Sequence, residues 1–427
     1  MKKIIVSAVV AAMALSTTAS ALEDIKTSGQ AKLWYETSDA NSYGAYSSKD
    51  GNLLDAAQSY GEVVFKLGVT GKQGNVGFGT TIYQTSTMGL EGTVVSNIRS
   101  ADEVNSAPFV GEAYITAPLI ASTIMKFGKQ ELNTPLAFTE TWNSVPNTFN
   151  AAVLVNNSVD NLTLIGAYVG QSTGSTATGN FDTGLAGSQF FGNAFAVAGL
   201  YKTDAISANV WGYQVNNALS NGLTWFAGGA SGVSLNGLWA DASMKAGVVN
   251  LTGTAAYVTT NADTPAGANV VHQGDATSAF ALSGNTTVSS VTLFAAASTV
   301  SEGHLHVANY ATGGKKSMLP TEAVYTDGLY VAQPGSTAFK LKASGKLGTT
   351  GLALQGVMNT NSDDTRYTAA AAGSDNAQDT TEVDLFITQK LGDFDLTAIL
   401  MNRSFADSTE DDNKGGNYVR VIAAVNF

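Results

Sequence analysis

The feature that most constrains the fold of this 427-residue chain is a hydrophobic pattern with a period of two. In residues 418–427 every odd-numbered position holds Val, Ala or Phe, whereas Tyr418, Arg420 and Asn426 lie at even-numbered positions. Successive strand residues point to opposite faces, so this pattern predicts a strand with one apolar face. The same alternation returns in residues 62–70, 250–257, 337–344 and 382–389.

The links between these segments are alternately short and long, which is typical of a membrane β-barrel with periplasmic turns and extracellular loops. We therefore predict an all-β, antiparallel, up-and-down transmembrane barrel of about 18 strands. The short links, rich in Gly, Asn, Asp and Ser, are near residues 71–75, 118–121, 156–161, 202–205, 246–248, 283–287, 347–349 and 390–393. The long links are near residues 38–58, 87–109, 131–150, 171–192, 215–232, 259–275, 299–335, 361–379 and 404–417.

The first residues have the pattern of a secretory signal peptide. Lys2 and Lys3 precede a short apolar run over residues 4–15, and Ala19-Ser20-Ala21 has the form that signal peptidase cuts. The apolar run is shorter than the roughly 20 residues of a membrane-spanning helix, which disfavours a retained anchor. We predict a signal peptide over residues 1–21, cleavage after Ala21, and a barrel domain over residues 22–427 in a bacterial outer membrane.

The composition narrows the class of function. The chain has 22 basic and 34 acidic side chains, and removal of two leader lysines leaves a formal charge of 20 − 34 = −14. Such an acidic protein is unsuited to nucleic acid, which binds clustered Lys and Arg. Cysteine is absent, so disulfides do not contribute to stability. A barrel of about 16 to 18 strands is wide enough to leave an aqueous channel, which indicates a porin.

Two segments resemble a known family. Residues 127–135 read Phe-Gly-Lys-Gln-Glu-Leu-Asn-Thr-Pro, and residues 155–164 read Val-Asn-Asn-Ser-Val-Asp-Asn-Leu-Thr-Leu. Both resemble segments of the OprD-like porins, particularly the Campylobacter-type major outer membrane porins. The resemblance implies an 18-stranded barrel, commonly a homotrimer, whose third extracellular loop, here residues 131–150, folds inward as the constriction. It also implies that the terminal aromatic residue, Phe427, is the signal read by the barrel-assembly machinery.

The sequence departs from the carboxylate-specific members of that family, which have a row of arginines along the pore. Only Arg99, Arg366, Arg403 and Arg420 are present, and of these only Arg420 is predicted to face the lumen. Specific uptake of anionic solutes is therefore not expected.

The candidate functional residues are charged groups expected inside the barrel. Glu131 and Glu140 lie in the predicted constriction loop, where carboxylates favour cations; alternatively, either points to loop backbone or to solvent. A charge on the lipid face costs about 2–4 kcal/mol at mid-membrane, which favours lumen positions for charged strand residues. These lumen residues are Lys32, Glu36, Glu62, Lys66, Glu112, Lys126, Lys340, Lys342, Glu382, Asp384 and Arg420.

Metal binding and catalysis are weakly indicated. His304 and His306 have a spacing compatible with a transition metal, but no third ligand is evident, and the pair is more typical of surface residues. Acidic groups in two long links suit Ca²⁺ or Mg²⁺ and contact with lipopolysaccharide, although a solvated charge run is the simpler interpretation. No cofactor is required, and no hydrolase, P-loop or zinc-protease motif is present, so an enzyme is not expected. The acidic groups are Asp363, Asp364, Asp407, Glu410, Asp411 and Asp412.

The sequence thus predicts a passive diffusion channel for ions and small hydrophilic solutes, mildly selective for cations. Two alternatives remain open. One is a substrate-specific outer-membrane channel, and the other is a structural or adhesive barrel that presents surface loops such as residues 299–335.

Overall fold

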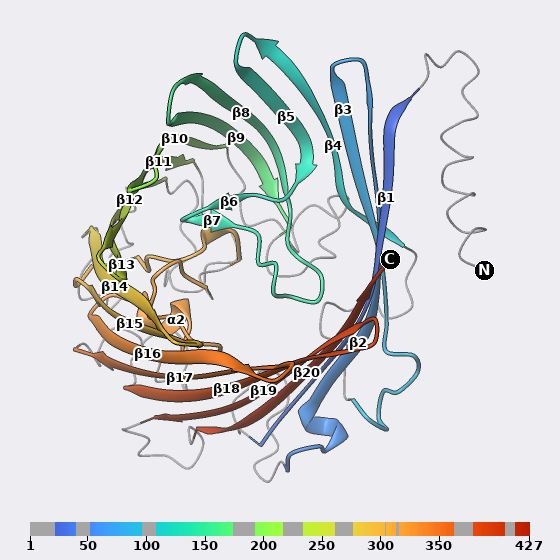
Figure 1. Ribbon diagram of the computed structural model, residues 1–427, viewed down its shortest axis with the longest axis vertical. Coiled ribbons are helices and arrows are strands. Elements are labelled where there is room, and N and C mark those ends of the chain that lie inside the picture. Colours follow the sequence, from blue (N-terminus) through green and yellow to red (C-terminus); the bar gives the residue numbers. More distant parts are fainter. Residues whose placement is uncertain are drawn as a thin grey trace, which may run out of the picture.

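The computed structural model describes residues 22–39, 52–95, 108–173, 193–216, 234–260, 276–303, 305–312, 316–362, 379–405 and 415–427. Its central feature is an 18-stranded antiparallel sheet that closes on itself, as the ring in Figure 1 shows. Each strand pairs with the next along the chain, and β20 pairs with β1 to complete the barrel. The prediction of about 18 strands is confirmed.

The barrel strands are mostly ten or more residues long, which suits a tilted crossing of a bilayer. A two-stranded sheet, β6–β7, lies inside the ring together with the short helix α2 (Figure 1). The strands are β1 (Glu23–Ser38), β2 (Ser59–Gln73), β3 (Val76–Ser86), β4 (Phe109–Ile120), β5 (Thr123–Gln130), β6 (Asn133–Thr134), β7 (Ala137–Phe138), β8 (Phe149–Val159), β9 (Leu162–Ser172), β10 (Ala194–Lys202), β11 (Ile206–Val215), β12 (Leu235–Ala246), β13 (Val249–Thr260), β14 (Thr277–Val288), β15 (Val291–Val300), β16 (Ser336–Leu347), β17 (Thr350–Asn361), β18 (Thr380–Leu391), β19 (Phe394–Phe405) and β20 (Gly416–Asn426), and the helical turns are η1 (Ala56–Gln58), η2 (Tyr310–Thr312) and α2 (Gly328–Val331).

The seam of the barrel is closed by the last residue of the chain. β1 and β20 pair from Gln30 with Asn426 to Ser38 with Tyr418. Beyond that ladder, Gly29 and Phe427 exchange main-chain hydrogen bonds of 2.7 and 2.9 Å. The Phe427 ring lies over Gly29, where an added Cβ would fall 2.1 Å from a ring atom. Glycine at this position therefore gives the terminal aromatic ring its place on the wall.

A second glycine is required by the backbone inside the wall. Gly128, in β5, has a φ of +123°, a value that side chains other than hydrogen rarely allow. A Cβ here would lie 2.3 Å from the main-chain oxygen of Ala113 on the neighbouring strand. The Gly of the Gly-Lys-Gln segment thus permits a close approach of β5 to β4 just before the chain enters the barrel interior.

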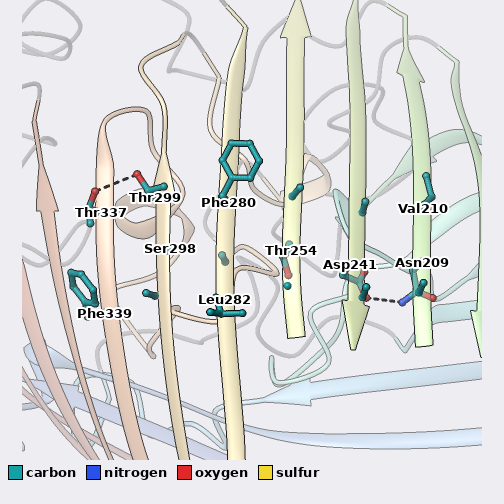
Figure 2. A pocket seen from close by; sticks show the side chains of 17 residues that line it. Asn209, Val210, Asp241, Thr254, Phe280, Leu282, Ser298, Thr299, Thr337 and Phe339 are labelled. Carbon is teal, nitrogen blue, oxygen red and sulfur yellow. Dashed lines mark hydrogen bonds between the residues drawn. The ribbon is translucent and has the colours of Figure 1, made fainter. Parts of the chain in front are cut away.

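The outer face of the wall is apolar. Figure 2 shows part of it across β11–β16, where Val210, Phe280, Leu282 and Phe339 surround a hollow of about 740 Å³. Small outward residues such as Ala240 form the floor of this hollow. An outward apolar band over a polar interior is the arrangement of membrane β-barrels.

Among the described residues, no helix has the length and hydropathy needed to cross a bilayer.

Of the links that the structure describes, two fold into the ring rather than away from it. We call residues 131–148, between β5 and β8, loop 3, and residues 301–335, between β15 and β16, loop 7. Leu136 of loop 3 and Leu305 and Tyr310 of loop 7 join Trp211 and Trp239 of the wall in one buried hydrophobic cluster. The core of this protein therefore lies inside the barrel, between these loops and the strands β8–β15.

Candidate functional site

Loop 3 is folded on itself inside the lumen. Asn133 pairs with Phe138 and Thr134 with Ala137 to form the β6–β7 hairpin. The Asn147 side chain accepts a hydrogen bond from the Glu140 main-chain nitrogen at 2.7 Å and donates to the Phe138 oxygen at 3.1 Å. The buried Glu140 nitrogen and Phe138 oxygen of loop 3 are thereby hydrogen-bonded within the loop, as polar groups removed from water require.

Loop 7 is joined to loop 3 mainly through Asn309. The Asn309 amide accepts from the Phe138 main-chain nitrogen and donates to the Phe138 oxygen, both at 3.0 Å. The Tyr310 nitrogen donates to the Leu136 oxygen at 2.9 Å. The two loops thus form one partition across the barrel.

Glu140 is part of this joint. Its carboxylate accepts hydrogen bonds from Asn143 at 3.0 Å, from Asn309 at 3.2 Å and from Thr312 at 2.5 Å. With 5 % of its surface exposed, Glu140 holds the two loops together instead of standing free in the opening. Its charge still contributes to the local potential, because it acts on Lys316.

A group of wall residues grips loop 7 at Tyr325 and Thr326. Glu382 of β18 accepts from the Tyr325 nitrogen at 2.9 Å and also from the Thr326 nitrogen. The Tyr325 hydroxyl donates to Glu36 of β1 and lies 3.2 Å from a nitrogen of Arg420, on β20. Arg420 and Glu36 form an ion pair of 2.5 Å. Three lumen residues predicted separately from the sequence are thus brought together by one loop.

Arg403 of β19 completes this grip and was not predicted. It donates to the Tyr325 main-chain oxygen at 3.0 Å and to the Tyr418 hydroxyl at 3.2 Å. Its guanidinium carbon also lies 4.8 Å from the centroid of the Phe405 ring. The interpretation that only Arg420 securely faces the lumen is therefore wrong: Arg403 lies two residues from the strand end, where the inward parity was difficult to fix.

Loop 7 contains a cluster of three charged side chains of its own. Lys316 lies 3.3 Å from Glu322 and 3.5 Å from Asp327. Burial raises the pKa of Glu322 to about 8 and that of Asp327 to about 6, although Lys316 acts in the opposite sense on both. Burial alone would lower the pKa of Lys316, but Asp327 and Glu322 outweigh it and raise that pKa. One lysine facing two carboxyl groups leaves this part of the loop acidic once both ionise.

A cavity of about 380 Å³ lies between the two loops and the wall strands β17–β20. Its lining combines charged and aromatic side chains from all three parts, including Glu140 and Trp142 of loop 3, Lys316 and Glu322 of loop 7, and Arg420 of the wall. In this cavity one of the two predicted constriction residues, Glu140, meets the loop 7 charges.

The predicted lysines of β1, β2 and β5 contact loop 3 or aromatic rings of the wall. Lys32 donates to two main-chain oxygens of loop 3, at 3.4 and 3.3 Å. The Lys66 nitrogen lies 5.6 Å from the centroid of the Tyr83 ring, and the Lys126 nitrogen lies 3.8 Å from that of Tyr114. Such cation–π contacts hold ammonium groups against the wall.

The acidic residues near these lysines form a second group. Glu112 accepts from the Thr81 hydroxyl at 3.1 Å and from the Glu131 main-chain nitrogen at 3.3 Å. Burial and then the charge of Glu112 raise the pKa of Glu131. Glu62 is buried on β2 and acts on Lys32. Glu131 is thus the loop 3 carboxylate that remains partly exposed, whereas Glu140 is enclosed.

The remaining predicted lumen residues lie on β16 and β18 behind loop 7. Lys340 donates to the Glu322 main-chain oxygen. Lys342 lies 5.4 Å from the centroid of the Phe386 ring, and Asp384 accepts from the Gln355 amide at 2.7 Å.

Two other expectations about loop 7 are wrong. Residues 305–312 of the predicted surface loop are buried throughout and join the cluster inside the barrel, so this part of the loop is not presented as a surface epitope. His306 is 3 % exposed and its ring contacts the Gly328 oxygen at 3.3 Å, so it is not a surface residue. The sequence feature that could have predicted this burial is the apolar content of the link, since its residues Leu305, Val307 and Leu319 are buried.

Several predicted residues cannot be placed. His304 and the acidic groups proposed for Ca²⁺ or Mg²⁺ lie outside the described residues. These groups are Asp363, Asp364, Asp407, Glu410, Asp411 and Asp412. Arg99 and Arg366 lie outside them as well.

Solved structures with this fold come from Pseudomonas aeruginosa. OccK3 (OpdO) matches with a TM-score of 0.66 and 12 % identity over 95 % of this chain and 96 % of its own. OccK2 (OpdF), in complex with glucuronate, matches with a TM-score of 0.64 and 13 % identity over 95 % and 98 %. OccD3 (OpdP) matches with a TM-score of 0.62 and 14 % identity over 96 % and 92 %.

Sequence comparison gives no relative: no family model matches the chain, and no curated protein does. At identities this low the structural likeness concerns the fold. The chain has the 18-stranded barrel fold that its resemblance to the OprD-like porins predicts.

Proposed function

We propose that the protein is a channel of the bacterial outer membrane through which ions and small hydrophilic solutes diffuse passively. The observation that carries the proposal is the closed 18-stranded barrel, apolar outside, whose interior is divided by two inward-folded loops with charged groups. A barrel of this width leaves room for water beside such loops. Loops 3 and 7 then restrict passage without filling the lumen.

A mild preference for cations is the finer part of the proposal. The two loops contain Glu131, Glu140, Glu302, Glu322 and Asp327 against the adjacent lysines 315 and 316. Carboxylates at a constriction concentrate cations there and repel anions. The positive charges of the wall lysines Lys32, Lys66 and Lys126 oppose this effect, which is why the preference is mild.

Planar-bilayer recordings of the purified protein test both parts. A diffusion channel gives ohmic current steps, and a salt gradient gives a reversal potential of the sign for cation preference. Replacing Glu131 and Glu140 together by Gln is expected to move that potential towards zero. Asp204→Asn, in a short turn away from the loops, is the matched control and should leave it unchanged.

Absence of current steps would reject the channel and favour a structural barrel. Current that a single solute blocks would favour the substrate-specific alternative. An unchanged reversal potential in the double variant would reject the selectivity argument alone.

Further parts of the proposal concern partners. Lipid and lipopolysaccharide would surround the apolar outer face, the barrel-assembly machinery would read Phe427, and three copies would associate, as the family resemblance implies. Chemical cross-linking in membranes followed by denaturing electrophoresis tests the trimer. A band at only the monomer mass would argue against it.

A further inference from the structure

The grip on Tyr325 and Thr326 has the composition of a ligand-binding site. A phenol hydroxyl lies between a carboxylate, Glu36, and a guanidinium, Arg420. The main-chain nitrogen beside it donates to Glu382, and the main-chain oxygen accepts from Arg403. We call Glu36, Glu382, Arg403, Tyr418 and Arg420 the tyrosine cradle. Every polar group of one tyrosyl unit thus has an acidic or basic side chain of the wall as its partner.

The cradle also fits the tyrosyl ring. The Tyr325 and Tyr418 ring centroids are 4.5 Å apart, and the guanidinium carbons of Arg403 and Arg420 lie 5.7 and 5.4 Å from the Tyr325 ring centroid. Aromatic and cation–π contacts of this kind favour a flat aromatic group over an aliphatic one.

Loop 7 does not use all the hydrogen-bonding capacity around the cradle. Among the described residues of the wall, no hydrogen-bond partner is found for Arg403 Nε, for the hydroxyl of Thr380, or for either amide atom of Asn359. All three side chains are more than nine-tenths buried. Asn359 lies opposite Thr380, and Arg403 lies opposite Glu382, on adjacent strands. Buried polar groups are normally satisfied, so the wall here offers more than its present occupant takes.

We propose that the cradle is a binding site for short peptides that begin with tyrosine, and that Tyr325 and Thr326 occupy it as an internal substitute. In such a peptide the free α-ammonium would replace the Tyr325 N–H at Glu382, and a contact with a neutral donor would become an ion pair. Charge-assisted hydrogen bonds are roughly twice as strong as neutral ones. The unpartnered Thr380 and Asn359 groups would face the second residue of the peptide.

The position of Glu382 separates peptides from free tyrosine. Its carboxylate accepts from the Thr326 nitrogen, the atom that follows the Tyr325 carbonyl. A peptide or a carboxamide has an N–H at that place, whereas free tyrosine has a carboxylate oxygen that Glu382 would repel. The site should therefore prefer L-tyrosinamide to L-tyrosine.

Vacating the cradle makes this measurable. In the full-length protein, replacing residues 324–326 by a single glycine shortens the loop and removes the phenol, the Tyr325 carbonyl and both N–H donors to Glu382. Calorimetric titration of this variant should show L-tyrosinamide binding at least about tenfold more tightly than L-tyrosine or L-phenylalaninamide, since each loses a buried charged hydrogen bond. Adding Glu382→Gln should bring the affinities for L-tyrosine and L-tyrosinamide together.

Tyr310→Gly is the matched control. Tyr310 is a buried tyrosine of the same loop, but its hydroxyl donates to the His306 main-chain oxygen, away from the cradle. A cavity left there should accept phenols without discriminating between tyrosine and its amide. Equal affinities for p-cresol and L-tyrosinamide in the vacated cradle would overturn the proposal, as would no binding at all.

The wild-type protein gives a test that does not depend on folding of the variant. Excess L-tyrosinamide should displace the loop and accelerate hydrogen exchange at the Tyr325 and Thr326 amides, and no acceleration at any concentration would overturn the proposal. The inference rests on the proposed channel only for how a peptide reaches the site. A protein that binds but does not conduct would refute the channel alone, and one that conducts without binding would refute the cradle alone.

Discussion

Asn309→Ala should separate loops 3 and 7. Asn309 is fully buried, and its amide makes two hydrogen bonds of 3.0 Å to the main chain of Phe138, one of 3.2 Å to Glu140 and one of 3.2 Å with the Ala311 N–H. Truncation removes all four and leaves the buried N–H groups of Phe138 and Ala311 without this partner. A buried hydrogen bond contributes about 1 kcal/mol net, and an unsatisfied buried donor costs about 1–3 kcal/mol.

The expected weakening of the loop contact is about 3 kcal/mol, after allowance for contacts that remain. The Tyr310 N–H to Leu136 bond and the Thr312 to Glu140 bond are still present in the variant. Each 1.4 kcal/mol is a factor of ten, so the population of separated loops should rise by about 100-fold.

Hydrogen exchange read by mass spectrometry measures this population. In the variant, amides of loops 3 and 7 should exchange about 100-fold faster, while those of β12 and β13 keep their wild-type rates. Asn250→Ala is the control, because it removes one exposed hydrogen bond, to Asn285, beside the turn between β12 and β13. Acceleration of less than about threefold at Phe138 would refute the role given to Asn309.

Three further outcomes are expected. Gly128→Ala should lower the free energy of unfolding in urea by about 1–3 kcal/mol, because the φ of Gly128 is +123° and an added Cβ would collide with the main chain of β4. Gly166→Ala is the control: no atom lies near its Cβ position, so its free energy of unfolding should be close to that of the wild type. Burial lowers the pKa of His306 to about 4, so the stability that its neutral ring gives to loop 7 should be complete above pH about 6.5 and be lost as pH falls towards 4, whereas the raised pKa values of Glu322 and Asp327 act in the opposite direction; His306→Gln should abolish the loss of hydrogen-exchange protection on the acid side, and persistence of that loss would contradict the role given to His306. Gly29→Leu should displace the Phe427 ring and reduce the yield of folded, heat-modifiable barrel on refolding from denaturant into detergent, where no assembly machinery acts, and Phe427→Ala in the same chain should relieve the clash; equal yields for Gly29→Leu and wild type would contradict the seam described above.

The sequence was most informative where structure depends on neighbours in the chain. A period of two in residues 418–427 and in the segments like it predicted strands, their inward and outward faces and, with the link lengths, the number 18. This works because strand parity is a local property, and because a charge on the apolar face is costly. Lys32, Glu62 and Lys126 could be assigned to the lumen from parity alone.

The path of loop 7 followed from no local pattern. Tyr325 meets Glu36, a residue 289 positions earlier, and Arg420 meets Glu36 across 384 positions. Such contacts arise only after β1 pairs with β20 and closes the barrel, because closure brings the two ends of the chain to one wall. The alternation of polar and apolar residues cannot predict these contacts, because it fixes which way strand side chains point but not the path of a long link between strands.

What the sequence by itself determined, then, is the barrel: its class, its strand number and the polarity of its two faces. The tertiary structure alone decided what the interior does, by folding loop 7 inward, enclosing Glu140 between the loops and placing Tyr325 in a ring of charged residues. The physical reason is that a strand's faces depend on residues one or two positions away, whereas a constriction and a binding site depend on closure of the whole sheet.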